Sequence, residues 1–146
     1  MTQIRKLLVA TDFSPCAAAA VHLAIDLAKQ FDAEILLLHV LPTLPAFYAF
    51  PDAVSVPVAW FEAARKQAQE HLSNESRRIH GPVVRTELRE GAIHDSIVAA
   101  AVTAKADLIV VGTHGRTGLK HALLGSVAER VVRTSPIPVL TVRSRE

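Results

Sequence analysis

Residues 4–40 read IRKLLVATDFSPCAAAAVHLAIDLAKQFDAEILLLHV, and this stretch sets the class of the fold. Its second apolar run, residues 35–38, shows no polar alternation, which is typical of a strand buried on both faces of a parallel sheet. Ser14 and Pro15 have the residue types of a helix N-cap and first helical position, and an alanine-rich helix follows to about Phe31. The stretch therefore predicts a β-α-β unit with strands over residues 4–11 and 33–40.

The same alternation of strand and helix continues along the rest of the chain. The third strand, residues 83–89, alternates apolar and polar side chains and is expected at an edge of the sheet. The remaining predicted elements are helices over 60–80, 92–105 and 127–133, and strands over 107–112 and 138–142. We predict one α/β domain spanning residues 1–146, an open five-stranded parallel sheet of order 3-2-1-4-5 with helices on both faces.

Net charge, cysteine content and the length of the apolar runs argue against several classes of protein. The formal net charge is +2 and the basic residues are scattered, so we expect no nucleic-acid binding. A single cysteine, Cys16, allows no intrachain disulfide and fits a reducing compartment. The longest apolar runs are far shorter than the ~20 residues that a membrane span needs, and the N-terminus has no signal-peptide pattern. We therefore expect a cytoplasmic protein that does not bind membranes.

The candidate site is a glycine-rich segment that follows the fourth strand. Four of the six glycines fall between Gly112 and Gly125, and Arg116 and Lys120 add positive charge to this segment. Glycine allows positive φ and close approach of a ligand to the main chain, and successive N–H groups can form an anion-binding concavity. The predicted strand order brings this segment to the switch point beside Asp12, where ligands of open parallel sheets bind. We favour phosphate binding over a merely flexible connection.

The spacing Gly112-x2-Gly115-x9-Gly125-Ser126 resembles the ATP-binding motif of the universal stress protein family, G-2x-G-9x-G-[S/T]. The surrounding segments LLVATDFSP, VVGTHGRTGL and LLGSVAERVVRTSPIPVLTV are similar to that family as well, and the resemblance covers nearly the whole chain. It implies a Rossmann-like fold of the adenine-nucleotide α-hydrolase type. It also implies an ATP-binding protein, with Mg²⁺ accompanying the nucleotide, that acts in stress response or regulation.

The resemblance also implies a role for each residue at the switch point. The end of the first strand would lie beside the adenosine, with Asp12 on the ribose or base, and Val40 would contact adenine. The segment around Gly115 would line the ribose and first phosphates, and the start of the last helix would hold the outer phosphates. The predicted nucleotide-binding residues are Ala10, Thr11, Asp12, Val40, Gly112, His114, Gly115, Arg116, Gly125, Ser126 and Val127.

Several of these residues have a structural alternative. Ser126 and Glu129 have the spacing of a capping box, in which the serine hydroxyl would serve the helix rather than a phosphate. We therefore expect backbone N–H groups to bind most of the phosphate. For His114 we favour ligand contact over catalysis, and for His39 a partner within the core. Cys16 is expected to be a small core residue.

Two other functions remain open from the sequence. One is a slow Mg²⁺-dependent ATPase, for which we name no catalytic residue. The other is a dimeric interaction module that ignores nucleotides. The resemblance implies a homodimer formed by antiparallel pairing of the last strands, through Val139, Leu140, Thr141 and Val142, because an apolar edge strand presents unpaired backbone groups.

Overall fold

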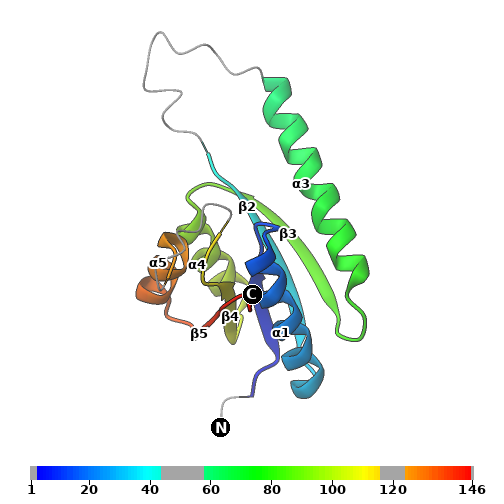
Figure 1. Ribbon diagram of the computed structural model, residues 1–146, viewed down its shortest axis with the longest axis vertical. Coiled ribbons are helices and arrows are strands. Elements are labelled where there is room, and N and C mark those ends of the chain that lie inside the picture. The colour runs from blue at the N-terminus through cyan, green and yellow to red at the C-terminus, as the bar shows by residue number, and fades with distance from the viewer. Residues whose placement is uncertain (1–2, 44–57, 116–123, 146) are drawn as a thin grey trace.

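The computed structural model describes residues 3–43, 58–115 and 124–145. Five parallel strands form one sheet in the order β3-β2-β1-β4-β5, with helices between them (Figure 1). The predicted α/β class and strand order are confirmed. In chain order, the elements are β1 (Lys6–Ala10), α1 (Pro15–Phe31), β2 (Glu34–Leu41), α3 (Val58–Arg78), β3 (Val84–Glu90), α4 (Ile93–Ala104), β4 (Leu108–Gly112), α5 (Ser126–Thr134) and β5 (Val139–Val142).

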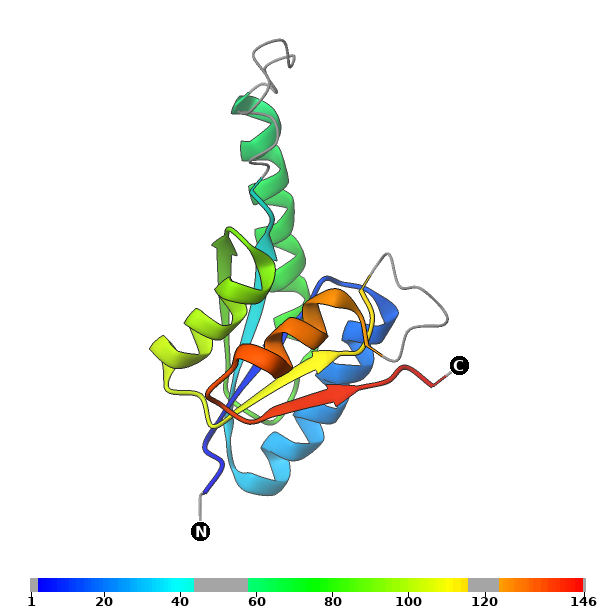
Figure 2. The same cartoon turned by 90° about the vertical axis from the view of Figure 1, so that its left-hand side faces the viewer.

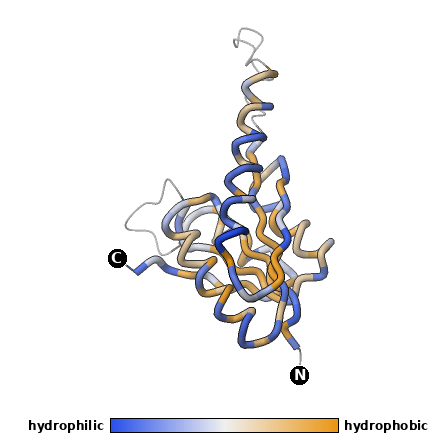
Figure 3. Tube along the Cα trace, turned by 90° about the vertical axis from the view of Figure 1, so that its right-hand side faces the viewer, coloured by the Kyte–Doolittle hydropathy of each residue, from blue (hydrophilic) through white to orange (hydrophobic). Residues whose placement is uncertain are grey.

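The helices form two layers, one on each face of the sheet. Helices α4 and α5 lie together over one face, while α1 and α3 cover the other (Figure 2). Side chains of β2 alternate between the layers: Ile35 and Leu37 pack in the α1/α3 cluster, and Leu38 and Val40 in the α4/α5 cluster. Hydrophobic segments accordingly gather in the sheet (Figure 3). Among the described residues, no helix is long and apolar enough to span a membrane.

The start of α1 has the predicted capping residues. Ser14 is the N-cap, and its hydroxyl accepts a hydrogen bond from the N–H of Ala17 at 3.2 Å. Pro15 occupies the first helical position, where no backbone N–H is needed. These two residues fix where the chain turns from β1 into the helix.

The position of β1 creates the switch point of the sheet. Leu7 of β1 is paired with Ile35 of β2 on one side and with Leu108 of β4 on the other. From β1 the chain enters α1 on one face, whereas from β4 it continues toward α5 on the opposite face. The carboxyl ends of β1 and β4 therefore lie side by side, with their connections diverging.

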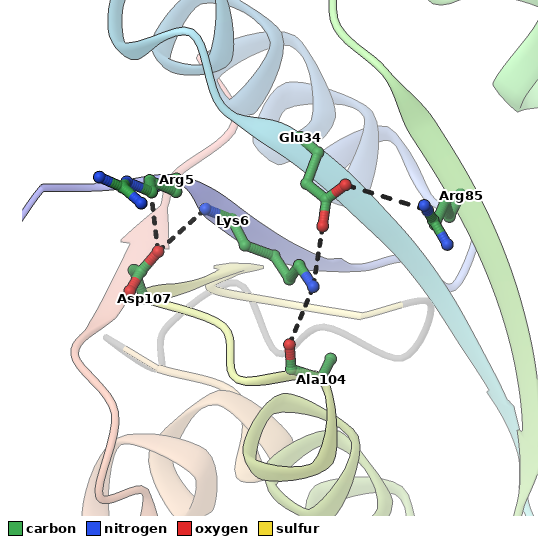
Figure 4. Close-up of polar contacts among 6 residues, drawn as sticks. All are labelled: Arg5, Lys6, Glu34, Arg85, Ala104 and Asp107. Atoms are coloured by element: carbon green, nitrogen blue, oxygen red, sulfur yellow. Dashed lines mark hydrogen bonds and ion pairs between the residues drawn. The ribbon is translucent and has the colours of Figure 1, made fainter.

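The opposite ends of the strands are joined by polar contacts (Figure 4). One carboxylate oxygen of Asp107, Oδ2, accepts hydrogen bonds from the backbone N–H groups of Arg5 at 2.8 Å and Lys6 at 3.0 Å. Asp107 directly precedes β4, so this carboxylate ties the start of β1 to the start of β4.

Lys6 extends the same network to β2 and α4. Its Nζ lies 2.8 Å from Oε1 of Glu34 and donates to the carbonyl oxygen of Ala104 at 3.0 Å. The hydrogen bond from Lys6 is the main reason that the pKa of Glu34 lies below its usual value, with a smaller contribution from Arg85. Ala104 is the last residue of α4, where a cation also interacts favourably with the helix dipole.

Candidate functional site

A pocket of about 300 Å³ lies at the carboxyl ends of β1 and β4. Of the eleven residues predicted to bind nucleotide, ten line it, and Arg116 falls outside the described residues. The ten come from three places: the end of β1, β2 next to it, and the segments that lead from β4 into α5. They are Ala10, Thr11, Asp12, Val40, Gly112, His114, Gly115, Gly125, Ser126 and Val127.

The α4 side of the pocket is apolar. Leu38 and Val40 of β2 face Ile93 and Ile97 of α4 across it, and Leu124 closes the end near α5. Ile93 and Ile97 were not among the predicted site residues, although their spacing on α4 predicts that both face inward. An apolar wall beside a few polar groups is typical of small-molecule sites.

Asp12 lines the pocket from the turn that follows β1. Its Oδ1 accepts a hydrogen bond from the N–H of Ser14 at 3.0 Å, which anchors the side chain at the start of α1. Its Oδ2 faces Gly115, where an added Cβ would come within 2.8 Å of that oxygen. The turn after β1 and the residues after β4 thus come together where the Asp12 carboxylate lies against the main chain of Gly115.

The described glycines of the motif lie where other segments of the protein approach the main chain closely. Gly112, Gly115 and Gly125 do not adopt positive φ, which among the described glycines occurs at Gly81 and Gly91. Positive φ, one of the two reasons for glycine considered from the sequence, therefore does not apply at these three positions. An added Cβ at Gly112 would lie 3.1 Å from backbone and sulfur atoms of Cys16, and one at Gly125 would lie 3.0 Å from the carbonyl oxygen of Thr113. These glycines are required because other protein segments approach them closely.

The predicted capping box at Ser126 is also wrong. Gly125 is the N-cap of α5, with extended backbone and no side-chain cap hydrogen bond, so Ser126 is already the first helical residue. The N–H of Glu129 bonds to the carbonyl of Gly125 at 3.0 Å, and the Glu129 carboxylate pairs with Arg133. The helix begins one residue earlier than the box requires, and the Ser126 hydroxyl is not needed as a cap.

The first turn of α5 gives the pocket an electropositive end. Ser126, Val127 and Ala128 line the pocket, and the first N–H groups of a helix have no acceptor within it. Together with the helix dipole, these donors favour an anion at this end. Because Glu129 is turned to Arg133, its carboxylate does not compete for the same donors.

Thr113 connects the glycine loop to its surroundings. Its N–H donates to Val142 of β5 at 2.9 Å, and its carbonyl accepts from Gly125 at 2.5 Å. Its buried hydroxyl lies 3.0 Å from Nδ1 of His114 and 3.7 Å from Sγ of Cys16. The backbone that follows β4 is therefore held from β5, α5 and α1 together.

Cys16 is buried, as expected of a small core residue. Burial by itself raises the pKa of its thiol, but hydrogen bonds from the backbone of His114 and the hydroxyl of Thr113 act in the opposite sense. With further backbone contacts at Ser144 and Thr113, these bonds leave the pKa below its ordinary value. The thiol belongs to the wall that supports Gly112 from behind.

His39 lines the pocket but was not among the predicted site residues. Its Nδ1 lies 2.7 Å from the carbonyl oxygen of Thr11, so the expectation of a partner within the protein is met. It also borders the pocket. A polar residue in an otherwise apolar strand was the available signal, but its partner depends on the register of β1 and β2.

Metal binding by side chains finds no support here. Within residues 3–43, 58–115 and 124–145, no group of three or more His, Cys, Asp or Glu side chains is placed to hold a metal ion.

Known proteins of one family match this chain in both sequence and fold. The model of the Universal stress protein family (Usp) matches residues 3–143. Universal stress protein MJ0531 of Methanocaldococcus jannaschii is 39% identical over 141 residues, covering 95% of this chain and 82% of that protein. The solved structure of MJ0577, from the same organism, has a TM-score of 0.79 at 30% identity and covers 99% of both chains.

A more distant neighbour shares the fold. A crystal structure of a universal stress protein in complex with cAMP matches with a TM-score of 0.71 at 24% identity. The match covers 99% of this chain and 100% of that one.

Proposed function

The chain belongs to the universal stress protein family, and we propose that it is an ATP-binding regulatory protein whose nucleotide occupies the pocket at the ends of β1 and β4. The observation that carries the proposal is the placement of Asp12. Its carboxylate faces the backbone of Gly115. The same pocket is lined by apolar side chains of β2 and α4 and by the first residues of α5. A nucleoside phosphate has groups that suit each of these three surfaces.

The adenosine part fits the side of the pocket near β2. The apolar side chains of Val40, Ile93 and Ile97 suit the faces of a base. A carboxylate at the switch point is the group that recognises ribose hydroxyls in nucleotide-binding sheets, and Asp12 takes that place. Its bond to the N–H of Ser14 keeps the side chain in one orientation before the ligand arrives.

The phosphates fit the side of the pocket near α5. Backbone N–H groups of Ser126 and Val127, the freed hydroxyl of Ser126 and the dipole of α5 all favour negative charge. Hydrogen bonds to charged groups contribute roughly 1.5–3 kcal/mol each. Three or four of them supply a large share of the about −8 kcal/mol of a micromolar complex.

Mg²⁺ would accompany the nucleotide rather than occupy a site of its own. This ion keeps several waters and is usually bound through substrate phosphates with one or two carboxylates. The lack of a metal-holding cluster among the described residues is compatible with that arrangement. Binding and regulation are preferred to hydrolysis, because Asp12 is engaged with Ser14 and faces Gly115.

We also propose that the protein is cytoplasmic and that it forms a homodimer through its last strand, β5. β5 pairs with β4 along one side and forms an edge of the sheet. Its four residues, Val139–Val142, are only partly buried within one chain. An edge of this kind offers backbone groups and apolar side chains to an identical strand.

Equilibrium dialysis and thermal-shift measurements with ATP and AMP test the nucleotide proposal. We expect ATP to bind and to raise the unfolding temperature, because a ligand that binds only the folded state stabilises it. Asp12→Asn keeps the acceptor for the Ser14 N–H but removes the charge, and should weaken binding about tenfold.

Asp32→Asn is the matched control. Asp32 caps the far end of α1 with φ of 54°, a conformation that asparagine tolerates well, so ATP affinity should not change. Absence of stabilisation by millimolar ATP and by AMP would contradict the proposed function. Equal loss of affinity in the two variants would contradict the role of Asp12.

A further inference from the structure

The turn that carries Asp12 has an unusual backbone conformation. Phe13 has φ of 63°, a left-handed value that is uncommon for a bulky side chain and costs energy. The N–H of Phe13 donates to the hydroxyl of Thr11 at 3.0 Å, which closes the turn locally. Such a conformation persists only where the surroundings hold it.

His39 holds this turn from the neighbouring strand. A carbonyl oxygen only accepts hydrogen bonds, so the 2.7 Å contact between His39 Nδ1 and the Thr11 oxygen means that Nδ1 carries the proton and donates. The Nδ1–H group is present in this tautomer of the neutral ring and in the charged ring alike. The acceptor of this hydrogen bond, Thr11, directly precedes Asp12 in the chain.

The ring of Phe13 is held between two histidine rings. Its centroid lies 4.6 Å from that of His39 on β2 and 5.1 Å from that of His71 on α3. Aromatic pairs at such separations contribute about 0.5–1.5 kcal/mol beyond the area that they bury. His39 thus contacts both neighbours of Asp12. Its Nδ1–H group donates to the carbonyl of Thr11, and its ring packs against the ring of Phe13.

We propose that His39 is a positioning residue of the nucleotide site, which aims the Asp12 carboxylate by holding Thr11 and Phe13. This inference rests on the proposed function, since it concerns the affinity of the same pocket. It differs from a direct ligand contact because the effect of His39 passes through Asp12. Its removal should therefore matter only while Asp12 is present.

The first experiment compares His39→Leu with His39→Asn by isothermal titration with ATP. Leucine retains apolar volume but removes the donor, and we expect the Kd to rise about tenfold. The asparagine amide places an N–H near the position of Nδ1 but does not replace the ring against Phe13, so the Kd should rise less than in His39→Leu, by about threefold. His80→Leu, an exposed histidine beyond the end of α3, is the matched control and should bind normally.

The second experiment is a double-mutant cycle with Asp12→Ala. If His39 acts by aiming Asp12, His39→Leu should change the Kd by less than about twofold in the Asp12→Ala background. Two effects that simply multiply would overturn the inference, since they would indicate direct contact or general loosening of the fold. Loss of ATP binding by the folded His39→Asn variant would overturn it as well.

The outcomes separate the two proposals. If the unsubstituted protein bound neither ATP nor AMP, the proposed function would fail and this inference with it. If the unsubstituted protein bound ATP and His39→Leu bound it equally well, only the positioning role would fail. Circular dichroism of each variant identifies any that does not fold. If His39→Leu does not fold, the Asp12→Ala cycle uses His39→Phe, which also removes the donor and for which the same results are expected.

Discussion

The two ends of the parallel strands hold similar polar groups in different arrangements. At the amino ends, the Asp107 carboxylate accepts two backbone N–H groups, and Lys6 is shared between Glu34 and the end of α4. At the carboxyl ends, Asp12 takes one N–H group through Oδ1, while Oδ2 faces Gly115 at the pocket. The first arrangement joins the starts of β1, β2 and β4 and the end of α4, whereas the second borders the pocket.

The helix termini show the same contrast. The last carbonyl of α4 receives the Lys6 ammonium group, so this end of the helix is neutralised by the protein. The first turn of α5 has no side-chain cap, and its serine hydroxyl and N–H groups border the pocket. From this difference we expect the polar groups at the amino ends to stabilise the sheet, and those at the carboxyl ends to serve the proposed nucleotide binding. Substitutions at each end should therefore separate stability from affinity.

The largest effect is expected at Gly115. In Gly115→Val, the Cβ would lie 2.8 Å from Oδ2 of Asp12, so the carboxylate would have to move and the branched side chain would enter the pocket. ATP affinity should fall about 100-fold or more, which corresponds to about 2.7 kcal/mol. Since Gly115 does not use positive φ, thermal unfolding without nucleotide should change little. Normal ATP binding by this variant would contradict the assignment of the site.

Asp107 should give the opposite result. Asp107→Ala leaves the N–H groups of Arg5 and Lys6 without their acceptor, and we expect a loss of about 1–2 kcal/mol in the free energy of unfolding. ATP affinity should stay unchanged. Chemical denaturation measures the loss, and Asp107→Asn, which retains an acceptor oxygen, should recover most of it. Weaker ATP binding in Asp107→Ala would show that the two ends are coupled.

Two serines allow a finer separation at the starts of α1 and α5. Ser126→Ala should weaken ATP binding about fivefold and leave the affinity for adenosine unchanged. It should also leave the free energy of unfolding unchanged, because the hydroxyl does not cap α5. Ser14→Ala removes a real N-cap bond to Ala17 and should cost about 1 kcal/mol of stability. Equal destabilisation by the two substitutions would restore the capping role of Ser126. Thermal unfolding and titration calorimetry provide both readouts.

The smallest effect concerns the pH dependence contributed by Lys6. Since the folded pKa of Glu34 is depressed, its contribution to stability is complete above the unfolded pKa of about 4.3 and is lost as the pH falls through the lower folded value. Lys6→Met removes the main cause, so stability should fall less steeply between about pH 5 and pH 3. The change should stay below about 1 kcal/mol, because both side chains are partly exposed. An unchanged acid profile would contradict this pairing, and Lys29→Met is the control.

Most of the fold was predictable because it depends on local patterns. Apolar runs, the Ser14-Pro15 cap and the alternation in the third strand gave the class, the strand order and the edge position of β3. The third strand was predicted over residues 83–89 and lies at Val84–Glu90. Such small shifts at element ends are expected, because hydrogen bonds across the sheet decide where pairing stops.

The site was less predictable because it depends on contacts between distant segments. Ten predicted residues line one pocket, but their role in binding stays a prediction. The capping box failed because Gly125, and not Ser126, is the last residue before the helix. The need for glycine at Gly115 arises from Asp12, more than 100 positions earlier, and the partner of His39 becomes visible only with the strand register. Spacing in the sequence gives no access to such distances.

The central place of β1 has a consequence for the order in which the protein is made. β1 is synthesised first, yet its second neighbour, β4, begins only at Leu108. Until then, one side of β1 lacks its partner strand, although Leu7, Leu8 and Val9 have no exposed surface in the finished protein. The proposed pocket also needs Gly125 and Ser126, which come later still. A nucleotide could therefore stabilise only a nearly complete chain, and not one released early from the ribosome.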